Sequence, residues 1–189
     1  MKDTRGYRKY LKYFTTVFGI LMLGVCFSPL STFAGFGVCV EGDCENGHGT
    51  YTLFGIEEYV GDFEGGVYSG KGTLTYFDGT EYVGTFNNGQ YNGKGSLTLP
   101  DGSSYVGDFR DGTYSGQGAL TKPGGEKYVG AFNNGEYEGK GTLIMPNGEK
   151  YVGDFKDGML HGHGVLTSSN GKDYHVQFED DNLISVSPQ

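Results

Sequence analysis

The chain has 189 residues, of which 36 are Gly and only five are Pro. Gly is far above its roughly 7% share of ordinary proteins, but the low Pro content and the lack of a Gly-X-Y period exclude collagen. Hydrophobic residues make up 36% of the chain, which is enough to exclude a low-complexity disordered segment. The apolar mass lies mainly in 15 Tyr and 13 Phe, with no Trp. This composition favours many short strands and predicts a repetitive all-β domain.

Residues 1–34 differ in composition from the rest and have the form of a secretory signal peptide. Five Lys/Arg and one Asp precede an uncharged run, Phe14 to Phe27, and a small-residue stretch then ends at Ala34. This order predicts cleavage after Ala34. The uncharged run, residues 14–27, is shorter than the roughly 20 residues that a spanning helix needs. The sequence therefore predicts an exported protein, periplasmic or secreted, with an uncleaved membrane anchor at residues 14–27 as the alternative.

Without residues 1–34 the chain carries nine Lys/Arg and 22 Asp/Glu, a net charge of −13. This charge repels phosphate backbones and anionic headgroups, so we expect no nucleic-acid partner and no direct binding to anionic lipids. Two Cys remain, Cys39 and Cys44, with a Gly among the four residues between them. In an oxidising compartment this pair predicts a Cys39–Cys44 disulfide, and two unpaired thiols are the alternative.

The rest of the chain is an internal repeat with a period of 23 residues. Six Tyr recur at this spacing, and they open the pentapeptides YVGDF, YVGTF, YVGDF, YVGAF, YVGDF and the divergent YHVQF. A fixed period of this length indicates a repeat architecture. We divide the chain into a signal peptide (1–34), a Cys-containing segment with a half repeat (35–58), five repeats (59–173) and a terminal half repeat with a short tail (174–189). The residues that define the repeat are Tyr59, Gly61, Phe63, Tyr82, Gly84, Phe86, Tyr105, Gly107, Phe109, Tyr128, Gly130, Phe132, Tyr151, Gly153 and Phe155.

Each repeat is expected to fold as two strands and two turns. In the second repeat Tyr82, Gly84 and Phe86 alternate with Val and Thr, a period of two that places both rings on one face of a sheet. The second strand places Tyr91, two Gly and Leu97 on one face in the same way. Rows of Gly weaken a strand unless something covers them, so we expect aromatic rings to lie flat across the glycines and form the core. Asn-Gly and Asp-Gly dipeptides supply the turns. The five repeats are thus expected to form five hairpins with ten strands.

The order Y-x-G-x-F, then G-x-G-x-L, at a 23-residue period resembles the MORN (membrane occupation and recognition nexus) repeat. The resemblance covers residues 46–178 and implies a row of β-hairpins in one long antiparallel sheet, used for scaffolding, membrane-proximal assembly or dimerisation. The chain departs from the repeat at Val176, where Gly is expected, which indicates a terminal cap. Kinase and methyltransferase domains accompany such repeats in some proteins, and the 11 residues after residue 178 cannot hold one.

A search for catalytic chemistry in the sequence yields no set of residues, and no cofactor, metal or small-molecule substrate is assigned. His161 and His163 lie two apart on a predicted strand, and His175 lies on the next strand, so a metal site is conceivable. The equivalent positions in other repeats are Ser, Asn, Glu and Lys, as on an ordinary solvated face, and we assign none. Asp62, Asp108 and Asp154 are two repeats apart, about 20 Å, too far to act as an acid/base pair.

We therefore expect a non-catalytic scaffold that acts outside the cytoplasm and presents an extended β surface to a protein partner or to a second copy. The alternatives are an accessory subunit or enzyme of the cell envelope, or a lipid-binding module. An enzyme would need a concave pocket with perturbed titratable groups.

Overall fold

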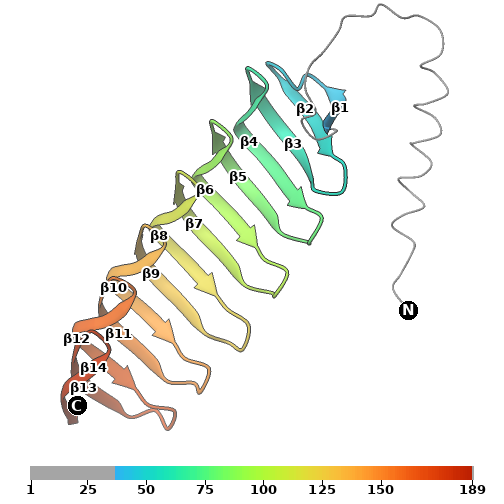
Figure 1. Cartoon of the computed structure of the whole chain (residues 1–189). Helices are drawn as coiled ribbons and strands as arrows, with labels where there is room; N and C mark the ends of the chain where they lie inside the picture. Colours follow the sequence, from blue (N-terminus) through green and yellow to red (C-terminus); the bar gives the residue numbers. More distant parts are fainter. Residues whose placement is uncertain (1–36, 189) are drawn as a thin grey trace, which may run out of the picture. The chain divides into compact units, whose positions relative to one another are not determined.

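The computed structural model describes residues 37–188, which form one open antiparallel sheet of fourteen strands (Figure 1). The predicted signal peptide, 1–34, and its 14–27 run lie outside the described residues. Strand order in the sheet is the order in the sequence, so each strand from β2 to β13 pairs with the one before it and the one after it, and β1 and β14 are the edges. The strands are β1 Gly37–Gly42, β2 His48–Leu53, β3 Glu57–Glu64, β4 Val67–Tyr76, β5 Glu81–Asn87, β6 Gln90–Thr98, β7 Ser104–Arg110, β8 Thr113–Thr121, β9 Lys127–Asn133, β10 Glu136–Ile144, β11 Lys150–Lys156, β12 Met159–Thr167, β13 Asp173–Glu179 and β14 Asn182–Pro188.

The two turns of each repeat have different geometry. In the second repeat, Asn88 and Gly89 join β5 to β6 with φ angles of 49° and 76°. Two consecutive positive φ angles define the type I′ hairpin turn that Asn-Gly favours. At the opposite end of the hairpin only Gly79 has a positive φ, of 96°, while Asp78 accepts a hydrogen bond from the Thr80 N–H at 2.8 Å. The sequence predicted both turns, and the structure shows that Asp78 serves the second one through its side chain.

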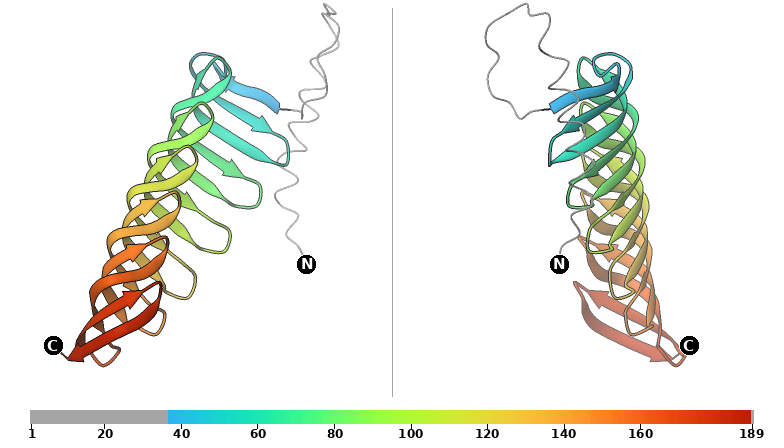
Figure 2. Two further views of the ribbon diagram at one scale, coloured as in Figure 1. Left: turned by 60° about the vertical axis from the view of Figure 1, so that its left-hand side comes forward. Right: turned by 90° about the vertical axis from the view of Figure 1, so that its right-hand side faces the viewer.

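A β-bulge interrupts the hairpin of every repeat at the same place. In the second repeat Gly84 pairs with Gly95 but Thr85 pairs with Asn92, so Gly93 and Lys94 are extra residues on β6. Gly93 has a φ of 66°, which requires Gly at this position. The corresponding φ angles in the other four repeats, at Gly70, Gly116, Gly139 and Gly162, are 56–65°. Because two residues are inserted, the alternation of faces is kept, and the strands bend across the width of the sheet (Figure 2).

The array is longer at both ends than the ten strands expected from five hairpins. At one end β1 pairs with β2, which carries the first half repeat. At the other end residues 182–188, which the sequence indicated only as a short tail, form β14 and pair with β13. Val176 of β13 is only 3% exposed and pairs with Val186. Its side chain belongs to the hydrophobic core cluster, at a position where the complete repeats have Gly.

Candidate protein-interaction surface

The first Tyr of each repeat lies flat across two glycines, as the sequence predicted. A Cβ placed on Gly84 would lie 2.5 Å from the hydroxyl oxygen of Tyr82, and a Cβ on Gly95, in the neighbouring strand, would lie equally close. The Tyr82 hydroxyl reaches beyond both glycines and donates a hydrogen bond to the Thr85 carbonyl, at 2.9 Å. Burial raises the pKa of Tyr82 to about 12, so the hydroxyl stays protonated as a donor. This face of the sheet is called the ring face below. Its five fully buried tyrosines are Tyr59, Tyr82, Tyr105, Tyr128 and Tyr151.

A second layer of tyrosines stacks on the first. Tyr91 lies parallel to Tyr82, with ring centroids 3.8 Å apart and an angle of 11° between the planes. Phe86 and Phe109, both nearly buried, meet Tyr91 edge-on from the two sides, at 5.7 and 5.8 Å. Tyr91 is itself half-buried, so the side of its aromatic ring that faces away from Tyr82 is the part left toward solvent. Four residues share this arrangement and are called the outer tyrosine row: Tyr68, Tyr91, Tyr114 and Tyr137.

The fifth repeat has Leu160 where the outer tyrosine row would continue. Leu160 pairs with Phe155 and is half-buried against the core. The sheet therefore accepts an aliphatic side chain at this position without losing its register. The row of flat aromatic platforms ends one repeat before the end of the array.

The opposite face, called the valine face below, carries exposed Val side chains and carboxylates that hold the bulges. Asp108 accepts a hydrogen bond from the Gln117 N–H at 3.0 Å and pairs with Lys94 Nζ at 2.7 Å. The Lys94 contact is the main cause that lowers the pKa of Asp108 below its ordinary value. Asp62 and Asp154 hold the bulges of the first and fifth repeats in the same way. These three Asp are thus structural groups, and the sequence, which treated them only as possible acids, missed this contact.

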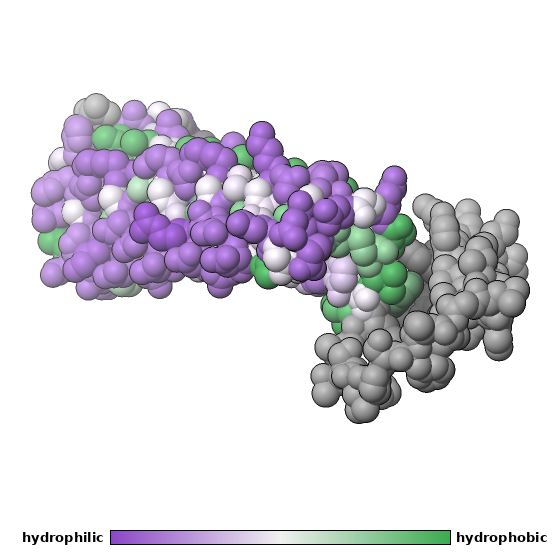
Figure 3. Space-filling view, turned by 90° about the horizontal axis from the view of Figure 1, so that it is seen from above, coloured by the Kyte–Doolittle hydropathy of each residue, from purple (hydrophilic) through white to green (hydrophobic). Residues whose placement is uncertain are grey.

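The exposed Val residues of this face follow the repeat as well. Val60, Val83, Val106, Val129 and Val152 are 39–57% exposed, one in each repeat. Val106 and Val129 line an open hollow together with small residues, Lys94 and Gln117. Figure 3 shows one side of the array, which is mostly hydrophilic, with apolar residues grouped at the end next to the grey atoms and in smaller spots elsewhere.

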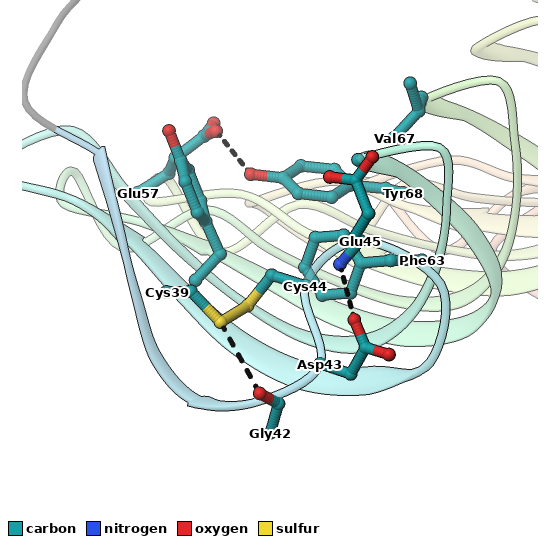
Figure 4. A pocket seen from close by; sticks show the side chains of 12 residues that line it. Cys39, Gly42, Asp43, Cys44, Glu45, Glu57, Phe63, Val67 and Tyr68 are labelled. Carbon is teal, nitrogen blue, oxygen red and sulfur yellow. Dashed lines mark hydrogen bonds between the residues drawn. A yellow bond between two sulfur atoms is a disulfide. The ribbon is translucent and has the colours of Figure 1, made fainter. Parts of the chain in front are cut away.

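An open hollow of about 800 Å³ lies at the N-terminal end of the outer tyrosine row (Figure 4). Tyr51 and Tyr68 line it with their rings 6.3 Å apart, and the Tyr68 hydroxyl donates to Glu57 at 2.9 Å. Asp43 and Glu45 add two more carboxylates, and the lining of the hollow contains no Lys or Arg. The hollow is therefore aromatic on its floor and negatively charged at its rim.

The predicted disulfide residues lie beside this hollow. Cys39 and Cys44 are joined in the structure, with a Cα–Cα distance of 5.9 Å. The bond ties β1 to the loop that leads into β2. It fixes the loop from which Asp43 and Glu45 face the hollow.

The three histidines considered as metal ligands are not assembled into a site. His161 Nδ1 lies 3.2 Å from a carboxylate oxygen of Asp180, and the backbone N–H of His163 donates to Asp154. Across residues 37–188 there is no group of three His, Cys, Asp or Glu side chains placed to hold a metal ion. The same part of the chain contains no helix that is long and apolar enough to cross a membrane.

The repeat geometry and the comparison with protein families agree on the family. The model of the MORN repeat matches residues 59–81, 82–104, 105–127, 128–150 and 151–172. The chain belongs to the MORN repeat family. No curated protein sequence matches it significantly.

Two solved structures are similar to this MORN-repeat chain in outline. One is the TCP domain of SAS-4 (dCPAP) of Drosophila melanogaster in complex with a proline-rich motif of Ana2 (dSTIL), at 12% identity, with a TM-score of 0.44 and coverage of 89% of this chain and 99% of that chain. The other is the wild-type TCP10 domain of Danio rerio CPAP in complex with a peptide of STIL, at 15% identity, with a TM-score of 0.36 and coverage of 76% and 80%. At these TM-scores the likeness carries no argument about the partner of this chain.

The outer tyrosine row is the functional feature that the sequence analysis did not isolate. Its members recur every 23 residues, from Tyr68 to Tyr137, and this second periodic Tyr series was a usable signal. What the period does not give is the stacking of each outer ring on a buried one. That depends on the pairing of Phe86 with Tyr91 across the bulged hairpin.

Proposed function

We propose that this MORN-repeat protein is a non-catalytic scaffold that acts outside the cytoplasm and binds a protein partner on its ring face. The observation that carries the proposal is the outer tyrosine row, in which each repeat from the first to the fourth presents one half-buried ring held from below and from both sides. Rigid aromatic side chains are enriched at protein interfaces because they contribute large contact areas at a low cost in conformational entropy.

The charge of the chain supports a protein partner over the alternatives. The net charge of −13 outside residues 1–34 opposes binding to nucleic acid and to anionic lipid. The hollow at the end of the row is open and rimmed by carboxylates. The disulfide supports an oxidising compartment, which agrees with the proposed export signal.

A crosslinking experiment tests the proposal on the face that it names. A photoreactive phenylalanine derivative replaces Tyr91 in one variant and Val83, on the valine face, in a matched control, and each protein is irradiated in its own envelope fraction. We expect a discrete protein adduct from the Tyr91 variant, absent from the Val83 control. Equal labelling from both faces, or adducts with lipid alone, would contradict a partner on the ring face.

A second copy of the chain is the other candidate partner, favoured by the edge strand β14. Leu183, Ile184 and Val186 in this strand are 53–56% exposed, and an unpaired strand edge is a template for a further strand. Sedimentation velocity over a range of concentrations tests this candidate. A dimer that Ile184→Lys abolishes would assign the edge to self-association, and a monomer at all concentrations would dismiss it.

A further inference from the structure

The spacing of the outer tyrosine row matches the pitch of a polyproline II helix. Successive platforms are two strands apart, which is about 9.6 Å at roughly 4.8 Å per strand. A polyproline II helix has three residues per turn and rises about 3.1 Å per residue, so one turn is about 9.3 Å. A chain in this conformation that runs along the array would bring every third residue over the next tyrosine.

The orientation of the rings suits prolines in particular. Each outer ring is nearly parallel to the buried ring beneath it, at 11–12°, so its other side points away from the sheet. At Tyr137 that side is partly occupied, because Lys122 Nζ lies over the ring, 6.0 Å from its centroid. Phe86 and Phe109 hold the Tyr91 ring edge-on from both sides and prevent it from turning. Aromatic-lined surfaces of this kind bind proline-rich segments because such segments are already extended and lose little entropy on binding.

The charge at the N-terminal end of the row defines the rest of the ligand. The hollow there combines the rings of Tyr51 and Tyr68 with the carboxylates of Asp43, Glu45 and Glu57, and its lining has no Lys or Arg. A cationic side chain is attracted both by carboxylates and by aromatic ring faces. The hollow is therefore complementary to Arg or Lys at one end of the bound segment.

We propose that the ring face binds a basic, proline-rich segment of the partner protein as a polyproline II helix, one turn per MORN repeat, with its basic end in the hollow beside the disulfide. This inference rests on the proposed scaffold function and names the chemistry of its partner. Four platforms span three repeats, about 29 Å, so roughly ten residues cover the row.

Binding of synthetic peptides to the purified protein tests the inference. The probe is two Arg followed by ten Pro, and the matched control has the same two Arg followed by ten alternating Gly and Ser. We expect the proline peptide to bind at least about tenfold more tightly, because the flexible control loses more entropy and offers no rings to stack. Equal affinity of the two peptides would show attraction by charge alone and would overturn the inference.

Three variants locate the site. Tyr114→Leu removes one platform and should weaken the proline peptide by about fivefold, and the natural Leu160 shows that the sheet accepts Leu at this position. Leu160→Tyr adds a fifth platform and should strengthen a peptide of thirteen prolines by a similar factor, without changing the affinity of the ten-proline peptide. Val106→Thr, on the valine face, should change neither affinity. Thermal melts of all variants confirm that each is folded.

The outcomes separate this inference from the proposed function. Unchanged affinity in both Tyr114→Leu and Leu160→Tyr, or a neutral polysaccharide that displaces the peptide and binds more tightly, would overturn the inference. If the proline peptide fails to bind while crosslinking at position 91 still yields a protein adduct, the partner lies on the ring face but is not a polyproline II segment.

Discussion

Gly107→Ala in the third repeat is the smallest change that should break the core, because the space for a Cβ is already filled. A Cβ at residue 107 would lie 2.6 Å from the Cα of Gly118 in the neighbouring strand and 2.6 Å from the hydroxyl oxygen of Tyr105. The first contact is with backbone, so it can be relieved only if the strands separate, and the second requires Tyr105 to leave its buried position. Overpacking of this kind costs about 1–3 kcal/mol. Loss of the hydrogen bond from Tyr105 to the Asp108 carbonyl, 2.9 Å long, adds about 1 kcal/mol.

We therefore expect Gly107→Ala to lower the free energy of unfolding by about 3 kcal/mol, and Tm by roughly 6–12 °C in an array of this size. Gly102→Ala is the matched control. Gly102 has a φ of 87° and nothing within 4 Å of its Cβ position, so only backbone strain of about 1 kcal/mol is expected. Thermal melts compare the two variants with the parent. Hydrogen exchange should show lost protection in β7 and β8 and their neighbours, since each repeat contacts only adjacent ones. A Gly107→Ala protein with the same Tm as the parent, or with a Tm no lower than that of Gly102→Ala, would refute the proposed packing of rings over glycines.

Four further predictions concern charge, the disulfide, export and lipids. The pKa of Asp108 is lowered in the folded state, mainly by Lys94, so its stabilisation is present at neutral pH and is lost as the pH falls through and below the ordinary value of 3.8. Asp108→Asn should thus lower Tm at pH 7 by more than at about pH 2.5, and an equal decrease at both would contradict this. Reduction of the Cys39–Cys44 bond, which closes a short loop, should cost about 2 kcal/mol and expose β1 to exchange first; thiol titration of the unreduced, denatured protein should find neither Cys free. N-terminal sequencing of the exported protein should begin at Gly35, and a start at Met1 would favour the uncleaved anchor. The exported protein should not sediment with anionic vesicles at physiological salt, and saturable, salt-sensitive binding would reveal a local basic surface that outweighs the net charge.

Much of the fold could be predicted from the sequence because the repeat gives the same information five times. The 23-residue period, the alternation of Tyr82, Gly84 and Phe86, and the Asn-Gly turns specify antiparallel hairpins in sequential order. The glycines also predict a ring above them, since uncovered Gly is unfavourable in a strand. These features depend on residues close together in the sequence, and a local pattern is sufficient to specify them.

The bulges and the outer layer of rings were decided only by the tertiary structure. From the sequence, Gly93 is indistinguishable from the other residues of its strand. The pairing of Gly84 with Gly95 shows that two residues of β6 are inserted there. The stacking of Tyr91 on Tyr82 then follows from contacts across that hairpin, and the contact of Asp108 with Gln117 follows from the same bulge in the third repeat. Register between strands depends on the sum of many weak contacts over the whole array, which the period of a single strand does not contain. The candidate binding surface is built from these cross-strand contacts, and for that reason it appears only when the strands are placed side by side.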